Sequence, residues 1–435
     1  MLGKLAVFLF VILSFTVPFF LHLTLPQQIA LGIFFLAVVL WISEIIPLYA
    51  TSIIILLLEA VLLPRVMDVS YKKFLHAFFS PVILLFLGGF TLARGMSVYG
   101  IEEIIARSII RRVGKNPYAV LLGFMSVSAF LSMWISNTAA TALMIAVAMP
   151  LLKKNESLRK PLILGIPFSA SIGGMGTPIG TPPNAIALEA MRKLGEDVSF
   201  PVWMLRGLPM VIVLVLFASF ILKLIYRPEE KEIEFEEEEV LLLEAKGKAV
   251  LATLAVTVLL WLTTSLHHIS SSIIALIPIA VFFGTGLLSR EDFRRLEWDV
   301  LILMGGGLAL GEAISVTGLD KLFAGYLGAS GNPALITAIF VAFTAIISNF
   351  MSNTSATAII MPLAISLPSP GLLPIAIAFA ASSAMVLPIS TPPNAIAYGS
   401  GYIKVRDMAF PGFIINLFSA LFIYISSLTW WKFLG

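Results

Sequence analysis

Two small polar clusters recur in an otherwise apolar sequence. The Ser-Asn-Thr triplet at 136–138 is followed by Thr-Pro-Pro-Asn-Ala-Ile-Ala at 181–187, and the same pair of motifs returns at 352–354 and 391–397. Asparagine amides and serine or threonine hydroxyls both donate and accept hydrogen bonds, so they can contact either a cation or an anion. The repetition predicts a duplicated binding site.

The proline motifs predict broken helices. Residues 173–183 cannot form a continuous helix, because the glycines loosen it and the two prolines remove donors and clash with the preceding turn. Residues 387–394 repeat this pattern. Unwinding exposes carbonyls that can coordinate Na⁺, and it frees a helix N-terminus that suits an anion. Neither motif contains Arg or Lys, so a bound anion needs compensation from co-bound cations.

The composition places these motifs in a membrane. Of the 435 residues, 59% are hydrophobic and only 12% are charged, which is too apolar for a soluble domain. Apolar stretches near the spanning length of about 20 residues recur along the chain. Examples are 5–21, 29–46, 211–225, 249–262 and 413–428. We therefore expect an all-α polytopic protein of the cell (inner) membrane, whose first apolar stretch is a retained span rather than a signal peptide.

Other bulk properties exclude several classes of function. The chain has no cysteine, which excludes disulfides and thiolate metal sites. Its formal net charge of +3 is too diffuse to predict a nucleic-acid partner. The sequence also lacks a His-Glu-x-x-His zinc motif and a Walker loop, which disfavours a pump driven by ATP.

Aligning the two halves shows that the repeat unit is most of a half-protein. Gly88 and Gly100 match Gly306 and Gly318 at an offset of 218, and Asn116-Pro117 matches a second Asn-Pro at an offset of 216. The Ser-Asn-Thr triplets keep the offset of 216, and the proline motifs lie 210 apart. Each unit predicts two spans, a Gly-rich span, a polar-tipped hairpin, a broken span and a closing span.

The polar triplets predict re-entrant hairpins. A single crossing over 118–152 would leave Asn137 deep in lipid, at a cost of several kcal/mol if its amide were unsatisfied. A hairpin that turns back inside the protein removes this cost, and the same argument covers the second triplet around Asn353. An alternative is that the Ser and Thr residues only pack one helix closely on another. That alternative explains isolated residues but not two triplets in register.

Charge predicts the orientation of the two halves. Basic residues flank the first hairpin on both sides, namely Arg107, Arg111, Arg112, Lys115, Lys153, Lys154, Arg159 and Lys160. The second hairpin has only Asp320 and Lys321 before it. By the positive-inside rule, the first hairpin enters from the cytoplasm and the second from outside. This predicts about eleven transmembrane helices, with the N-terminus inside and the C-terminus outside, although Lys72, Lys73, Arg192 and Lys193 count against it.

The predicted organisation has four parts. They are an extra first helix (1–24), a first repeat (25–226) with a hairpin at 116–152 and a broken helix at 161–190, an acidic cytoplasmic linker (227–248), and a second repeat (249–435) with a hairpin at 332–367 and a broken helix at 372–400. The acidic run at 229–239 is expected to be a solvated linker, and a cation-binding regulatory role is the weaker alternative.

These paired motifs resemble the divalent anion:sodium symporter family, whose members carry dicarboxylates, citrate or sulfate. The resemblance covers nearly the whole chain. It implies sodium sites at Ser132, Ser136, Asn137 and Gly180, and at Ser348, Met351, Asn353 and Ser390. It implies substrate binding by Ser136, Asn137, Thr138, Ser352, Asn353, Thr354, Thr391 and Pro392. Ser348 departs from the threonine expected in the family, keeping the hydroxyl but losing a methyl group.

The resemblance further implies sodium-coupled symport of C4-dicarboxylates such as succinate, malate or fumarate, without an enzymatic cofactor. It also implies a homodimer with a fixed scaffold and a sliding transport domain. A sodium-independent exchanger, a sulfate or citrate transporter, and a channel are alternatives. A remote alternative is an intramembrane serine hydrolase, since 328–331 reads Gly-Ala-Ser-Gly. Only four histidines could serve Ser330 as a base, and glycine and serine are ordinary turn residues.

Further charged and aromatic residues are expected to have structural roles. Glu44 and Glu59 lie in apolar spans, where an interfacial or scaffold position is favoured over a proton path. Arg94 and Glu312 occupy equivalent repeat positions and are predicted to anchor the ends of spans. Trp298, Trp430 and Trp431 fit the aromatic belts of a membrane protein.

Overall fold

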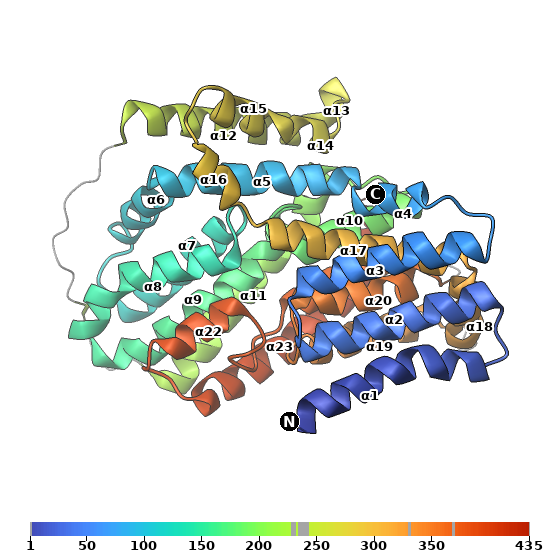
Figure 1. Ribbon diagram of the computed structural model, residues 1–435. Helices are drawn as coiled ribbons and strands as arrows, with labels where there is room; N and C mark the ends of the chain where they lie inside the picture. Colours follow the sequence, from blue (N-terminus) through green and yellow to red (C-terminus); the bar gives the residue numbers. More distant parts are fainter. Residues whose placement is uncertain (1, 228–231, 234–242, 329–331, 368–369, 435) are drawn as a thin grey trace.

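A computed structural model describes the chain except residues 1, 228–231, 234–242, 329–331, 368–369 and 435 (Figure 1). Within the described residues the fold is all-α, which confirms the predicted fold class. Most of the acidic run at 229–239 lies outside the described residues, and so does Ser330 of the hydrolase alternative.

The first half contains α1 (Leu2–Thr16), α2 (Leu25–Ser43), α3 (Leu48–Leu62), α4 (Lys72–Phe78), α5 (Pro81–Val98), α6 (Ile101–Ile110), α7 (Pro117–Ser132), α8 (Asn137–Lys154), α9 (Arg159–Gly173), α10 (Pro182–Lys193) and α11 (Phe200–Tyr226). The second half contains α12 (Ala245–Leu262), α13 (Thr264–His267), α14 (Ser271–Ile274), α15 (Leu276–Gly284), α16 (Arg290–Arg294), α17 (Trp298–Val316), α18 (Leu319–Gly328), α19 (Pro333–Ile347), α20 (Asn353–Ile365), α21 (Leu373–Ser382), α22 (Pro392–Gly399) and α23 (Val405–Leu428). Short 3₁₀ turns are η1 (Val17–Phe20), η2 (Leu63–Arg65), η3 (Glu156–Leu158), η4 (Gly174–Gly176) and η5 (Trp430–Phe433).

The outer helices present apolar stripes to their surroundings. In α11 and in α23 the large exposed side chains recur every three or four residues along most of the helix, which puts them on one face. They are Ile212, Leu216, Phe220 and Leu224 in α11, and Phe410, Phe413, Leu417, Leu421 and Ile425 in α23. Surface of this kind suits hydrocarbon rather than water. Among the described residues, seven helical segments are long and apolar enough to cross a membrane, and the count of about eleven crossings stays a prediction.

Each polar triplet lies at a turn between two helices. The Asn116 side chain accepts from two backbone N–H groups and starts α7, and the Ser136 side chain caps α8 after the turn. Asn332 and Ser352 do the same for α19 and α20. In Figure 1, α7 and α8 lie on the left of the molecule while α19 and α20 lie on the right. The re-entrant position of both turns in a membrane stays a prediction.

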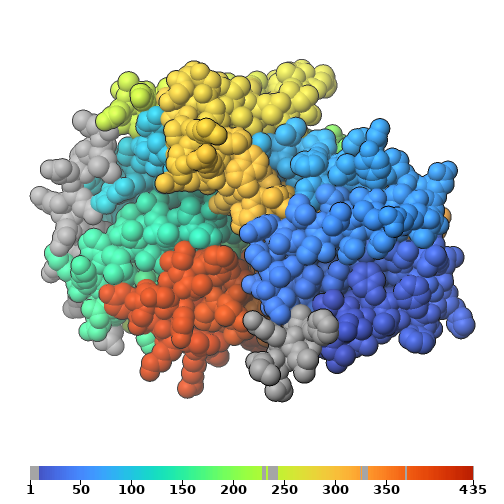
Figure 2. Space-filling model, in the orientation of Figure 1, coloured from blue at the N-terminus to red at the C-terminus, as the bar shows by residue number. Residues whose placement is uncertain are grey.

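Two helices are interrupted at the proline motifs. The first stops at Gly173 and restarts as α10 at Pro182, and the second stops at Ser382 and restarts as α22 at Pro392. Each restarted helix packs on the hairpin of the opposite half: α10 contacts α20, and α22 contacts α8. Figure 2 shows the C-terminal segment (red) lying against the green segment that contains the first hairpin. This exchange brings both turns and both interruptions to the centre of the molecule.

Ion pairs connect helices of different halves. Arg94 of α5 binds Asp292 of α16 at 2.7 Å, and Glu312 of α17 binds Lys73 of α4 at 3.2 Å. Glu312 also accepts from Lys193 of α10 at 2.8 Å. The equivalent residues Arg94 and Glu312 therefore carry opposite charges. Each pairs with a short helix of the other half, namely the one that precedes the Gly-rich helix of that half.

Candidate binding site

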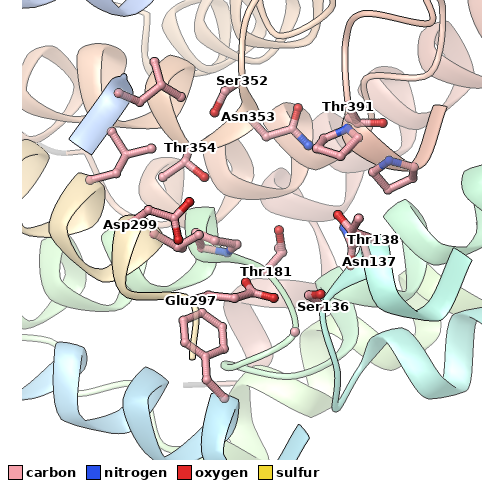
Figure 3. Close-up of a pocket in the computed structure, with 18 of the residues that line it drawn as sticks. Ser136, Asn137, Thr138, Thr181, Glu297, Asp299, Ser352, Asn353, Thr354 and Thr391 are labelled. Carbon is pink, nitrogen blue, oxygen red and sulfur yellow. The ribbon is translucent and has the colours of Figure 1, made fainter. Parts of the chain in front are cut away.

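A cavity of about 650 Å³ lies where the two hairpin turns and the two interruptions meet. All eight predicted substrate-binding residues line it, namely Ser136, Asn137, Thr138, Ser352, Asn353, Thr354, Thr391 and Pro392. In Figure 3 the first triplet lies across the cavity from the second, with Thr391 beside it. Small-molecule sites typically have volumes of roughly 300–1,000 Å³, so the cavity has the size of such a site.

Four helices begin at this cavity, so their N-cap residues form part of its wall. Ser136 and Ser352 cap α8 and α20, and Thr181 and Thr391 precede α10 and α22. All four of these residues line the cavity. The first turn of each helix has N–H groups without helical partners and a partial positive charge. The cavity is therefore built to attract an anion.

Fixed positive charge is missing from the described residues that line the cavity. They include no Lys, Arg or His, whereas Glu44, Glu297 and Asp299 are acidic. Partial charges of helix ends are weaker than a full charge on a side chain. A dianion bound here needs cations bound beside it.

Each hairpin turn contains an equivalent hydrogen bond, which holds the asparagine of that turn. The Ser132 hydroxyl donates to Asn137 Oδ1 at 2.5 Å, and the Ser348 hydroxyl donates to Asn353 Oδ1 at 2.7 Å. Ser348 also contacts the carbonyl of Ala381 at 2.8 Å, at the end of α21. The serine that replaces the family's expected threonine thus makes hydrogen-bond contacts with both the turn and the interrupted helix.

Oxygen atoms gather behind Asn137 and at the second interruption. A Cβ placed on Gly174 would lie 2.8 Å from Asn137 Oδ1 and 3.2 Å from the carbonyl of Gly180, so only glycine allows this approach. In the second half, the Ser390 hydroxyl donates to the carbonyl of Leu387 at 2.6 Å. Hydroxyl, amide and carbonyl oxygens are the ligands that a hard cation such as Na⁺ takes.

The predicted sodium residues form two layers. Ser136, Asn137, Gly180, Asn353 and Ser390 line the cavity itself. The other three do not line it: Ser132, Ser348 and Met351 are buried behind it. The cavity wall therefore lies between these three residues and an anion in the cavity.

The asparagines of the proline motifs have a role that sequence reasoning left unassigned. Asn184 Nδ2 donates to the carbonyls of Gly174 and Thr177, both at 2.8 Å. Asn394 Nδ2 donates to the carbonyl of Leu387 at 3.1 Å. Both side chains tie the restarted helix to the unwound segment. The repeat offset of 210 relates Asn184 to Asn394 and Thr177 to Leu387, so the repeat could have predicted that both asparagines have the same role.

Three further residues of the cavity wall were missed. Thr181 is the repeat equivalent of Thr391, so the offset of 210 could have identified it. Glu297 directly precedes α17 and lines the cavity together with Ser136, and Asp299 follows in the first turn of the helix. No repeat signal marked Glu297, because its equivalent at an offset of 218 is Phe79.

The two acidic residues expected in scaffold positions lie in different surroundings. Glu44 ends α2 with a left-handed backbone and lines the edge of the cavity. Glu59 is fully buried in α3, and neither of its carboxylate oxygens has a hydrogen-bond partner.

Known proteins match the chain over most of its length. A family model described as citrate transporter matches residues 38–375. The sodium-dependent dicarboxylate transporter SdcS of Staphylococcus aureus (strain bovine RF122 / ET3-1) is 34% identical over 459 residues, covering 94% of this chain and 87% of the relative. The SdcS protein of strain MSSA476 gives the same figures.

A solved structure supports the fold. The Alcanivorax borkumensis YdaH transporter has a TM-score of 0.55 and 16% identity, and the match covers 84% of this chain and 89% of that chain. The relatives and the family are membrane transporters, so this chain is a transporter and not an enzyme. The extent of these matches confirms the resemblance carried by the doubled Ser-Asn-Thr and Thr-Pro-Pro-Asn motifs: the chain belongs to the divalent anion:sodium symporter family.

Proposed function

We propose that this protein is a sodium-coupled symporter of C4-dicarboxylates such as succinate, malate or fumarate. The observation that carries the proposal is the cavity: four helix N-termini attract an anion there, and no described cationic side chain lines it. Co-bound Na⁺ supplies the missing positive charge. The relatives named sodium-dependent dicarboxylate transporters support both parts of the proposal.

The proposed substrate has the same two-ended form as the site. One carboxylate is held by Asn137 and Thr138 at the N-terminus of α8, and the other by Asn353 and Thr354 at the N-terminus of α20. Thr391 and Pro392 contact the substrate from the start of α22. Sulfate carries a similar charge but is compact, so it would engage one end of this site and leave the other unused. A linear dianion uses both ends.

The two sodium ions are proposed to bind behind the asparagines. The first site uses Ser132, Ser136, Asn137 and the carbonyl region at Gly180, and the second uses Ser348, Met351, Asn353 and Ser390. Each ion then lies between a hairpin turn and an interrupted helix. Binding of Na⁺ would fix the asparagine that holds the substrate, which is how cation binding prepares the anion site.

We further propose an elevator mechanism in a homodimer of the cell membrane, with the N-terminus in the cytoplasm and the C-terminus outside. The hairpins and interrupted helices would move as one body, since each restarted helix packs on the opposite hairpin. The hydrogen bond that Lys193 of α10 donates to Glu312 of α17 would be exchanged during the movement.

Uptake of radiolabelled succinate into proteoliposomes tests the proposal. Vesicles with and without internal succinate are exposed to an inward Na⁺ gradient or to K⁺ alone. We expect uptake into empty vesicles with Na⁺ and none with K⁺. Uptake that needs no Na⁺ but requires internal succinate would establish an exchanger instead, and the sodium sites would be withdrawn.

Citrate is the second candidate substrate, because the matching family model is described as a citrate transporter. Competition by unlabelled citrate, malate, fumarate and sulfate against labelled succinate ranks the candidates. We expect malate and fumarate to compete at concentrations similar to succinate. Stronger competition by citrate would change the substrate assignment without changing the coupling.

A further inference from the structure

All charged side chains among the described residues of the cavity wall are acidic, which is unexpected for an anion site. Glu297 lines the cavity together with the substrate-binding residue Ser136, and both residues also line a smaller adjoining pocket of about 150 Å³. Figure 3 shows Glu297 beside Ser136 at the first hairpin turn, with Asp299 on the same side of the cavity. Glu297 comes from the start of α17, a helix that packs mainly on α3 and α4.

The fold does not require a carboxylate at this position. The repeat equivalent of Glu297 is Phe79, and α5 starts two residues later without any acidic residue in its first turn. Position 79 carries an exposed aromatic ring rather than a polar cap. The acidic group therefore distinguishes the first hairpin from the second and is not a consequence of the repeat.

The N-terminus of α17 offers partial stabilisation to a negative side chain. Glu297 and Asp299 lie at the positive end of a 19-residue helix, where a negative side chain is stabilised. An ionised Glu297 carboxylate beside Ser136 attracts a cation to the first hairpin and repels a dianion from the same region. Its two effects on binding have opposite signs, and Coulomb attraction and repulsion at such short range are substantial.

We propose that Glu297 is a coupling residue: its charge strengthens Na⁺ binding at the first hairpin and weakens binding of the dicarboxylate until that Na⁺ is present. The inference rests on the proposed function and deepens it. An empty carrier then prefers Na⁺ over the substrate as its first ligand, and dicarboxylate binding without the cation is suppressed. The second hairpin has no repeat equivalent of the Glu297 carboxylate, so the two sodium sites are not equivalent.

Two equilibrium titrations of the purified protein test this role. Trp134 lines the cavity, so tryptophan fluorescence is the readout. Na⁺ is titrated without substrate, with choline chloride keeping the ionic strength constant, and succinate is titrated in choline chloride without Na⁺. In Glu297→Gln we expect the half-saturating Na⁺ concentration to rise roughly threefold to tenfold, and the Kd for succinate without Na⁺ to fall by a similar factor.

Matched variants separate charge from shape. Glu297→Asp keeps the charge and is expected to restore both values to within about twofold of the wild type. Glu291→Gln removes the same charge from an exposed position of α16 that does not line the cavity, where water screens it, and is expected to change neither value. If Glu297→Gln fails to fold, Asp299→Asn replaces it and is expected to move both values in the same directions, by less.

The outcomes separate the inference from the proposed function. If the wild type binds Na⁺ and succinate but Glu297→Gln leaves both values unchanged, or weakens both together, the side chain has no coupling role and the inference is wrong while the symporter proposal stands. If the wild type responds to succinate but not to Na⁺, the symporter proposal itself fails and the inference fails with it.

Discussion

Asparagine side chains at the two hairpin turns are the centre of the site at the scale of single residues. Asn137 and Asn353 each accept a hydrogen bond from a serine five residues earlier and each line the cavity. The amide nitrogen is then free to donate to an anion, while the oxygen faces the proposed cation. One side chain can thus contact both ligands.

Replacing either asparagine by alanine is expected to abolish transport without unfolding the protein. Alanine offers neither the oxygen for the cation nor the N–H groups for the anion. Uptake of succinate into proteoliposomes should fall to the background of empty vesicles, while the elution profile in gel filtration stays that of the wild type. Asn116→Ser is the control, since it keeps a capping oxygen at the distant start of α7. Full activity in Asn137→Ala or Asn353→Ala would remove that residue from the site.

Thr181→Val tests a wall residue that the sequence motifs did not assign. The Thr181 hydroxyl makes no capping bond to α10 and lines the cavity, so it is available to the substrate. Loss of one hydrogen bond to a charged ligand costs about 1.5–3 kcal/mol, which predicts a KM for succinate at least roughly tenfold higher. Thr337→Val removes an exposed hydroxyl of α19 and should leave KM unchanged. An unchanged KM in Thr181→Val would place the substrate away from α10.

At the scale of elements, close approach between the first hairpin and the first interruption depends on glycine. Gly174 lies against Asn137, and the Gly174 carbonyl accepts a hydrogen bond from the Asn184 side chain. The sequence predicted both interruptions and both polar turns, because proline, glycine and buried polar residues have strong local effects on helices. It could not predict which helix packs on which, since the exchange of α10 and α22 between the halves is a property of tertiary packing.

Gly174→Ala is expected to reduce transport at least tenfold. The added Cβ would lie 2.8 Å from Asn137 Oδ1, so the turn must shift away from the carbonyl of Gly180. Half-saturation by Na⁺ should rise as well, measured as the Na⁺ dependence of succinate uptake. Gly284→Ala is the matched control, because nothing lies within 4 Å of its Cβ. Equal activity in the two variants would show that the approach of turn and interruption has no role in transport.

Element-level expectations for two other groups had different outcomes. Arg94 and Glu312 were predicted to anchor the ends of spans, and the structure adds that they join opposite halves of the chain. Trp431 was predicted to lie in an interfacial belt, and this is wrong for that residue: its side chain is fully buried and packs edge-on against Phe379. Composition near a chain end does not distinguish a belt residue from a core residue.

At the scale of the whole molecule, the two pseudo-symmetric halves meet at one cavity. The repeated motifs predicted a binding site duplicated between the halves, and the family resemblance implied eight substrate residues from both halves, all of which line the same space. The acidic side chains of that wall could not be predicted, because Glu297 and Asp299 belong to a helix whose start matches no motif. Orientation in the membrane remains a prediction from charge alone.

Labelling of single cysteines tests that orientation directly, because the natural chain has no cysteine. Lys153→Cys lies after the first hairpin and Glu196→Cys lies between α10 and α11, both at exposed positions. We expect a membrane-impermeant maleimide to label position 196 in intact cells and position 153 only after the membrane is opened. The reverse pattern would invert the predicted topology, placing the N-terminus outside.

In the proposed symporter, positive charge for the bound dianion comes from co-transported Na⁺. The most direct test is the simultaneous flux of ²²Na⁺ and ¹⁴C-succinate into the same proteoliposomes, under a gradient of each in turn. Two sodium sites predict that a succinate gradient drives Na⁺ entry and that at least two Na⁺ enter for each succinate. Succinate entry without accompanying Na⁺ would contradict the account.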